Sequence, residues 1–210
     1  MRRIVLLSLL LTVIPLQTNA APLDDALTTL NSLSVKGRAA KTGYTRAQFP
    51  TWSDLDRNGC DTRNEILNRD LTMVSFKAGT RDCKVISGSL IDPYSGKVIV
   101  FSSTKSTIDI DHVVALSNAW QTGAAYFDKN KREAIANDPL NLLAVDYTLN
   151  RQKGDGDAAT WLPPLKTYRC DYVARQIAVK AKYALWVTAP EKGAIVKILE
   201  KCVGQRIPIS

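Results

Sequence analysis

The chain has 210 residues, of which 45% are hydrophobic and 23% charged, and a formal net charge of +8. This length can bury a substantial core, as one domain with an N-terminal extension or as two small lobes. After the first residues no segment is apolar enough to span a bilayer, so an integral membrane protein is not expected. The basic charge favours a polyanionic partner, nucleic acid first and an anionic cell wall second.

The first twenty residues have the pattern of a secretory signal peptide. Arg2 and Arg3 are followed by the apolar run 4–16, and small residues precede Ala21. An uncleaved anchor is the alternative, but the run is short and is interrupted by Pro15. We therefore expect cleavage near Ala20–Ala21 and a secreted, soluble protein without a membrane anchor. Its formal charge would be +6, because the signal carries two arginines and no acidic residue.

The remaining sequence predicts an α+β fold with a small β element among helices. Residues 23–33 have apolar side chains at helical spacing and two aspartates in the first turn, whereas residues 36–50 are polar and read as a linker or surface loop. Alternating residues in 84–103 predict two strands around a turn at 92–96. The other predicted elements are helices over 62–73, 117–127, 129–136 and 170–186, a strand over 142–145, and a last helix from Pro190.

The four cysteines predict two disulfides, since their number is even and the chain is expected in an oxidising compartment. Four cysteines allow three connectivities. Sequence proximity favours Cys60 with Cys83 and Cys170 with Cys202. A zinc site is disfavoured, because no two cysteines are spaced as CxxC and the one histidine is distant in sequence.

Residues 54–65 fit the twelve-residue calcium-loop pattern. Oxygen-bearing side chains fall at the first, third, fifth and twelfth positions, which are Asp54, Asp56, Asn58 and Glu65, with a glycine at the sixth. Against this, the eighth position is polar and no clear helix enters the loop. A structural Ca²⁺ and a turn that caps the following helix therefore both stand as interpretations.

The single histidine, His112, carries the strongest functional signal. It follows Asp111 at the end of a β-rich run, and Asn141, Asn150 and Lys153 come later in the chain. A neutral imidazole can take a proton from water near physiological pH. Carboxylate and amide oxygens can hold Mg²⁺, which completes its shell with water and substrate phosphate. Because neighbouring side chains of a strand point to opposite faces, such a site needs a terminal or distorted strand.

These residues lie in an ordered set of motifs. The set comprises Asp111-His112-Val113-Val114, then Asn141-Leu142-Leu143, then Asn150, Lys153, Gly154 and Asp155. It resembles the HNH nucleases, whose ββα-metal fold places such motifs on two strands and a helix. Over residues 108–164 the run is similar to secreted bacterial HNH-family proteins and to the nuclease module of the Gmr modification-dependent restriction enzymes.

The resemblance implies a role for each motif residue. His112 would be the general base that activates water, and Asp111 and Asn150 would bind Mg²⁺ or Mn²⁺. Asn141 would orient His112 through backbone hydrogen bonds. Lys153 would contact phosphate, and Asp155 would support the site from behind. The last motif position is asparagine rather than histidine, which argues against zinc.

We therefore expect an HNH nuclease domain over residues 51–210, after a helix and linker over 21–50. It would act as a monomer on DNA, with RNA as a second candidate, and with little sequence specificity, since no groove-reading motif is present. A non-catalytic exported module that binds cell wall or extracellular DNA through the calcium loop is the alternative. A serine hydrolase or a zinc hydrolase is not expected, because the sequence has neither a nucleophile-elbow motif nor a set of zinc ligands.

Overall fold

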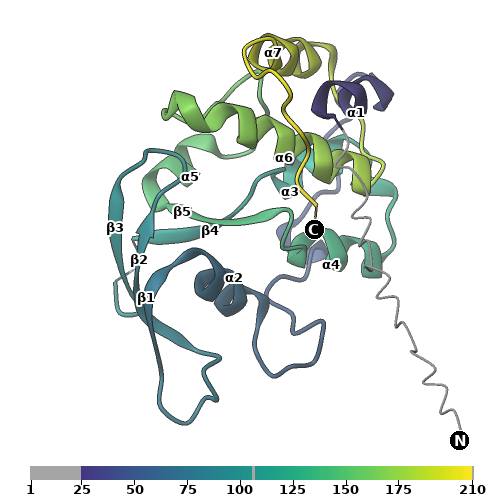
Figure 1. Cartoon of the computed structure of the whole chain (residues 1–210). Coiled ribbons are helices and arrows are strands. Elements are labelled where there is room, and N and C mark those ends of the chain that lie inside the picture. The colour runs from purple at the N-terminus through teal and green to yellow at the C-terminus, as the bar shows by residue number, and fades with distance from the viewer. Residues whose placement is uncertain (1–24, 106, 210) are drawn as a thin grey trace, which may run out of the picture.

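A computed structural model describes residues 25–105 and 107–209 and has the expected α+β class (Figure 1). The predicted signal peptide lies outside the described residues. None of the described helices is long and apolar enough to cross a membrane. The helices are α1 (Ala26–Ser32), α2 (Thr62–Asp70), α3 (Leu116–Gln121), α4 (Lys129–Asn137), α5 (Tyr147–Lys153), α6 (Arg169–Lys182) and α7 (Ala189–Leu199). The strands are β1 (Thr72–Phe76), β2 (Val85–Ile91), β3 (Val98–Ser102), β4 (Ile108–His112) and β5 (Leu142–Asp146).

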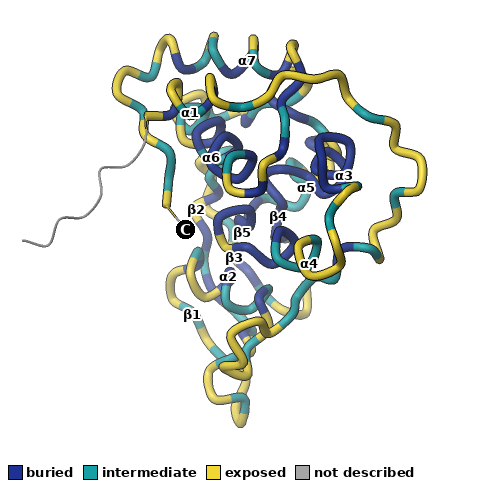
Figure 2. The backbone as a smooth tube through the Cα atoms, turned by 90° about the vertical axis from the view of Figure 1, so that its right-hand side faces the viewer, coloured by how far each residue is buried: buried dark blue, intermediate teal, exposed yellow. Residues whose placement is uncertain are grey.

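A two-stranded ribbon of β4 and β5 occupies the middle of the molecule. The strands pair antiparallel from Ile108 opposite Asp146 to His112 opposite Leu142. Side chains of β5 alternate between two cores, with Leu143 in the core shared with α1, α6 and α7 and Leu142 in the core shared with α2 and the larger sheet. Figure 2 shows the ribbon as buried backbone between these layers. A strand covered on both faces explains why its sequence is a continuous apolar run rather than an alternating one.

Helices α1, α6 and α7 lie together on one side of the ribbon (Figure 1). The apolar face of α6 packs against α1 and α7, and its residues Tyr172 and Ile177 are fully buried. Helix α7 starts with a capping box between Thr188 and Glu191 and has Pro190 in its first turn, which suits a helix start. These helices hold the ribbon from one face.

The other face of the ribbon packs against α2 and a three-stranded antiparallel sheet with the order β1-β2-β3. The predicted hairpin is confirmed as β2 and β3, joined by the turn that begins at Asp92. The predicted helix over 62–73 is wrong at its end. It stops at Asp70, and Thr72–Phe76 forms β1, because pairing with β2 outweighs the helical pattern there.

The predicted disulfide pairing is confirmed. Cys60–Cys83 ties the loop before α2 to the turn between β1 and β2, with Cα atoms 4.9 Å apart. Cys170–Cys202 joins the start of α6 to the end of α7, with Cα atoms 5.9 Å apart. In the chain-entropy account each cross-link stabilises the fold by roughly 3–4 kcal/mol.

Candidate catalytic site

Helix α5 directly follows β5 and lies against β4. Asp146 caps its start by accepting a hydrogen bond from the Leu149 amide at 2.8 Å, and Gly154 ends it with a φ of 52°. Residues one turn apart on α5 then meet alternate residues of β4. Asn150 Nδ2 donates to Asp109 Oδ2 at 3.1 Å, and Lys153 Nζ donates to Asp111 Oδ1 at 2.9 Å.

A pocket of 320 Å³ opens where β4 ends and α5 crosses it. The predicted residues Asp111, His112, Asn150 and Asp155 all line it, together with Asp109 and, from the N-terminal part of the chain, Tyr44 and Arg46. Asp111 and His112 can share one site only if they lie in a terminal or distorted strand. This condition is met, because His112 is the last residue of β4. Adjacent side chains that leave the backbone in opposite directions therefore border one cavity.

The imidazole of His112 is fixed by one backbone carbonyl. Its Nε2 lies 2.9 Å from the oxygen of Ala136, at the end of α4. A carbonyl oxygen can only accept, so we assign the ring proton of the neutral form to Nε2. Nδ1 then carries a lone pair. In this tautomer Nδ1 is the ring nitrogen that can accept a proton.

Burial lowers the pKa of His112 to about 4, and the positive charge of Arg46 acts in the same direction. The hydrogen bond to the Ala136 carbonyl opposes this shift but does not cancel it. His112 is 5% exposed, and the ring of Trp52 lies 6.1 Å from it, centroid to centroid. At neutral pH the imidazole is therefore uncharged.

We expect the single imidazole of the metal-free protein to titrate near pH 4 in ¹H NMR, without overlap from any other histidine. Unfolding returns the pKa to about 6.5, so the unfolded chain binds more protons between these values. His112 should therefore remove stability as the pH falls from 6.5 to 4, by about 3 kcal/mol in all. A titration midpoint near 6.5 would show that the ring is not buried in this way.

Asn141 is fully buried and holds the backbone on both sides of the imidazole. Its Oδ1 accepts from the Val114 amide at 2.8 Å, and its Nδ2 donates to the Ile135 carbonyl at 3.3 Å. Val114 lies two residues after His112, and Ile135 immediately precedes the carbonyl that the ring contacts. The Asn141 amide thus joins the backbone after His112 to the segment whose carbonyl contacts the imidazole, and its role in orienting His112 stays a prediction.

Asp111 lines the pocket and is 4% exposed. Tyr94, on the turn between β2 and β3, donates its hydroxyl to Asp111 Oδ2 at 2.5 Å, and Lys153 pairs with Oδ1. The Lys153 ammonium also donates to the His112 carbonyl at 2.9 Å, and its side chain has no exposed surface. Lys153 does not line the pocket. The predicted phosphate contact by Lys153 therefore does not fit the geometry, because its ammonium is occupied in the interior.

Asp155 lines the pocket itself, and about half of its side chain is exposed. Burial alone would raise its pKa, but hydrogen bonds from Lys41 at 2.6 Å and Ser117 at 2.9 Å outweigh this and hold the pKa below its usual value. The carboxylate ties α3 and the N-terminal part of the chain to the loop after α5.

The sequence interpretation missed four residues of the site: Asp109, Tyr94, Tyr44 and Arg46. Asp109 had a usable signal, since it lies two residues before Asp111 and shares its face of the strand. No sequence signal marks Tyr94, Tyr44 or Arg46 as part of the site. Tyr94 reaches it from the turn between β2 and β3, and Tyr44 and Arg46 from a stretch whose sequence resembles a linker. Within the described residues no three His, Cys, Asp or Glu side chains form a metal-binding group. A cation here would therefore need the Asn150 oxygen and water in addition to the carboxylates of Asp109 and Asp111.

The calcium-like loop does bring its four predicted side chains together. Asn58 Nδ2 donates to Asp56 at 2.8 Å and to Glu65 at 2.7 Å, while Asp54 accepts from the amides of Asn58 and Gly59. The same geometry serves a self-contained turn before α2, which is capped by Asp61. Calcium binding stays a prediction.

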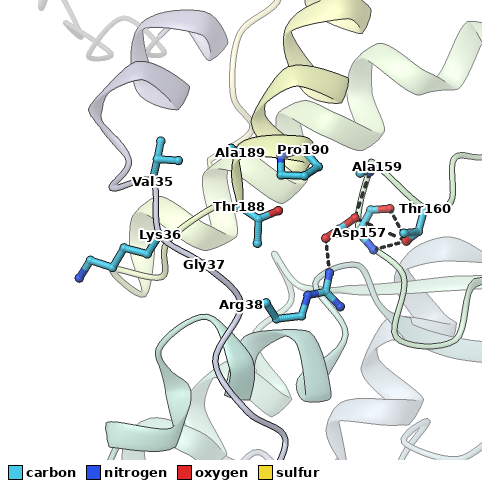
Figure 3. A pocket seen from close by; sticks show the side chains of 10 residues that line it. All are labelled: Val35, Lys36, Gly37, Arg38, Asp157, Ala159, Thr160, Thr188, Ala189 and Pro190. Carbon is cyan, nitrogen blue, oxygen red and sulfur yellow. Dashed lines mark hydrogen bonds and ion pairs between the residues drawn. The ribbon is translucent and has the colours of Figure 1, made fainter.

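A second cavity, of 530 Å³, lies beside the start of α7 (Figure 3). Its lining includes Val35, Ala189 and Pro190, and the Arg38 guanidinium reaches across to pair with the buried Asp157. None of the predicted catalytic or metal-binding residues lines it. The chemistry therefore concentrates in the pocket between β4 and α5.

Fold and pocket together define a disulfide-bonded α+β protein in which a neutral imidazole stands beside carboxylates. Residues 61–198 match the family described as the C-terminal domain of GmrSD restriction endonucleases, and the chain belongs to this nuclease-related family. It is 38% identical over 191 residues, 90% of each chain, to an uncharacterized secreted protein of Arthroderma benhamiae. That relative is fungal, so a bacterial source is not shown. No solved structure matches the chain.

Proposed function

We propose that this protein is a secreted, metal-dependent endonuclease of the HNH type that hydrolyses DNA with little sequence specificity. RNA is a second candidate substrate. The observation that carries the proposal is the neutral imidazole of His112, held through Nε2 by the Ala136 carbonyl and bordering the same pocket as Asp109, Asp111 and Asn150. The strand–strand–helix order of β4, β5 and α5 supports a ββα-metal nuclease core.

The donor set of the pocket fits Mg²⁺ or Mn²⁺, which prefer oxygen ligands. Asn150 uses its Nδ2 towards Asp109, so its Oδ1 remains for a cation. Both Asp111 oxygens already accept hydrogen bonds, and Asp109 is therefore the less committed carboxylate. When bound here, the cation would neutralise phosphate charge and assist the leaving oxygen. We assign its binding to Asp109, Asp111 and Asn150.

The residues of the chain would share the remaining work. His112 Nδ1 takes a proton from the attacking water, and the resulting imidazolium is held by the Ala136 carbonyl. Asn141 keeps the ring and its carbonyl partner in register. Lys153 and Tyr94 fix the Asp111 carboxylate from below, so that the pocket is formed before substrate arrives.

Incubation of plasmid DNA with the purified protein tests this function. We expect cleavage with Mg²⁺ or Mn²⁺ and its loss in EDTA, because the cation neutralises the phosphate. Products with heterogeneous ends would agree with low sequence specificity. DNA binding without cleavage under every divalent ion tried would contradict the nuclease proposal and favour the alternative, a non-catalytic exported module.

A further inference from the structure

One wall of the catalytic pocket comes from outside the family domain. The family match begins at residue 61, whereas Tyr44 and Arg46 line the pocket from the stretch between α1 and α2. We call residues 33–50 the N-terminal segment. The sequence pattern indicates a linker or surface loop over residues 36–50, but Tyr44 and Arg46 make the segment part of the pocket.

The N-terminal segment is packed firmly onto the domain. Its short 3₁₀ turn, Arg46–Gln48, is closed by a capping box with Thr45. Phe49 follows directly and is 1% exposed. The Tyr44 ring lies 6.0 Å from Phe49 and 5.9 Å from Trp120 of α3, centroid to centroid. Upstream, the ion pair between Arg38 and Asp157 fastens the segment to the loop after α5 (Figure 3). Arg46 is therefore presented from a fixed backbone.

Arg46 is also the cation of this segment that remains available beside the pocket. Arg38 pairs with Asp157 and Lys41 with Asp155, whereas Arg46 is exposed and makes no ion pair with any described carboxylate. Arg46 lines the same pocket as His112 and Asp111, so its guanidinium lies beside the residues proposed to act on the phosphate. The buried Lys153 cannot fill this place, since its ammonium is held by Asp111.

We propose that Arg46 binds a non-bridging oxygen of the scissile phosphate, so that the N-terminal segment completes the active site of the family domain. This inference rests on the proposed nuclease function. A planar guanidinium suits phosphate, because two of its N–H groups can donate to it in parallel. It would also stabilise the negative charge that grows as water attacks phosphorus.

The test compares Arg46→Ala and Arg46→Lys with Lys36→Ala in the full chain. Lys36→Ala is a matched control because it removes one positive charge from the same segment. The Lys36 ammonium lies over the Trp186 ring, and Lys36 does not line the catalytic pocket. With Mg²⁺ and an oligonucleotide substrate, we expect Arg46→Ala to lower kcat/KM by about 10²-fold, mainly through kcat. Arg46→Lys should recover only part of this loss, and Lys36→Ala should match the wild type.

A second readout does not require turnover. In EDTA, the affinity for a fluorescent oligonucleotide is measured at several salt concentrations. Arg46→Ala should reduce the slope of log affinity against log salt by about one, as expected for one lost phosphate contact, and Arg46→Lys should keep the slope. A wild type that cleaves DNA, with Arg46→Ala equal to Lys36→Ala in both readouts, would overturn the inference and leave the nuclease function standing. A wild type that never cleaves would overturn the function itself.

Discussion

His112→Ala is expected to lower kcat by about 10²–10⁴-fold on DNA with Mg²⁺, because this is the range that a positioned general base supplies. The fold should persist, since the substitution removes one hydrogen bond, to the Ala136 carbonyl, and no buried charge. Far-UV circular dichroism and initial rates of cleavage measure the two effects side by side.

A matched control separates catalysis from destabilisation. Ile135→Val shortens a fully buried side chain one residue before the Ala136 carbonyl, at a cost of about 1 kcal/mol. It should cleave DNA almost as fast as the wild type. If His112→Ala also keeps wild-type turnover, His112 is not the base, and if it unfolds, the imidazole is structural.

Lys153→Met is expected to lower the free energy of unfolding by about 3–5 kcal/mol, because it leaves the Asp111 carboxylate buried without its cation. Urea denaturation measures the loss. The control is Lys41→Met, whose pair with Asp155 is about half exposed and should contribute less than about 1 kcal/mol.

The double variant Asp111→Asn with Lys153→Met sharpens this prediction. It removes both charges, so it should be more stable than Lys153→Met alone. Equal, small losses for Lys153→Met and Lys41→Met would contradict the buried pair and would favour the phosphate contact that the sequence predicts for Lys153.

The local sequence pattern was sufficient to predict those elements whose structure depends mainly on their own residues. The run 142–145 became β5 because both of its faces are covered, and the turn at 92–96 separates β2 from β3 because its residues favour a turn. The cysteine pairing followed from short loop closure. In the site, the sequence predicted which motif residues would meet, and Asp111, His112 and Asn150 do border one pocket.

The local sequence pattern did not predict the features that depend on contacts between residues far apart in the chain. Strand β1 exists because β2 is there to pair with it, so the helical pattern ran past its true end. The burial of Lys153 depends on Asp111 and on Tyr94 from a distant hairpin turn. The N-terminal segment resembles a linker because most of its residues are polar, yet Phe49 anchors it. Such long-range contacts leave no periodic signal in the chain.

A crystal of the protein soaked in Mn²⁺ and measured for anomalous scattering would show where the cation binds. We expect an anomalous peak in the pocket within coordination distance of Asn150 and of Asp109 or Asp111, close to the His112 ring. A peak confined to the loop 54–65, with the pocket between β4 and α5 unoccupied, would contradict a metal-dependent catalytic site there.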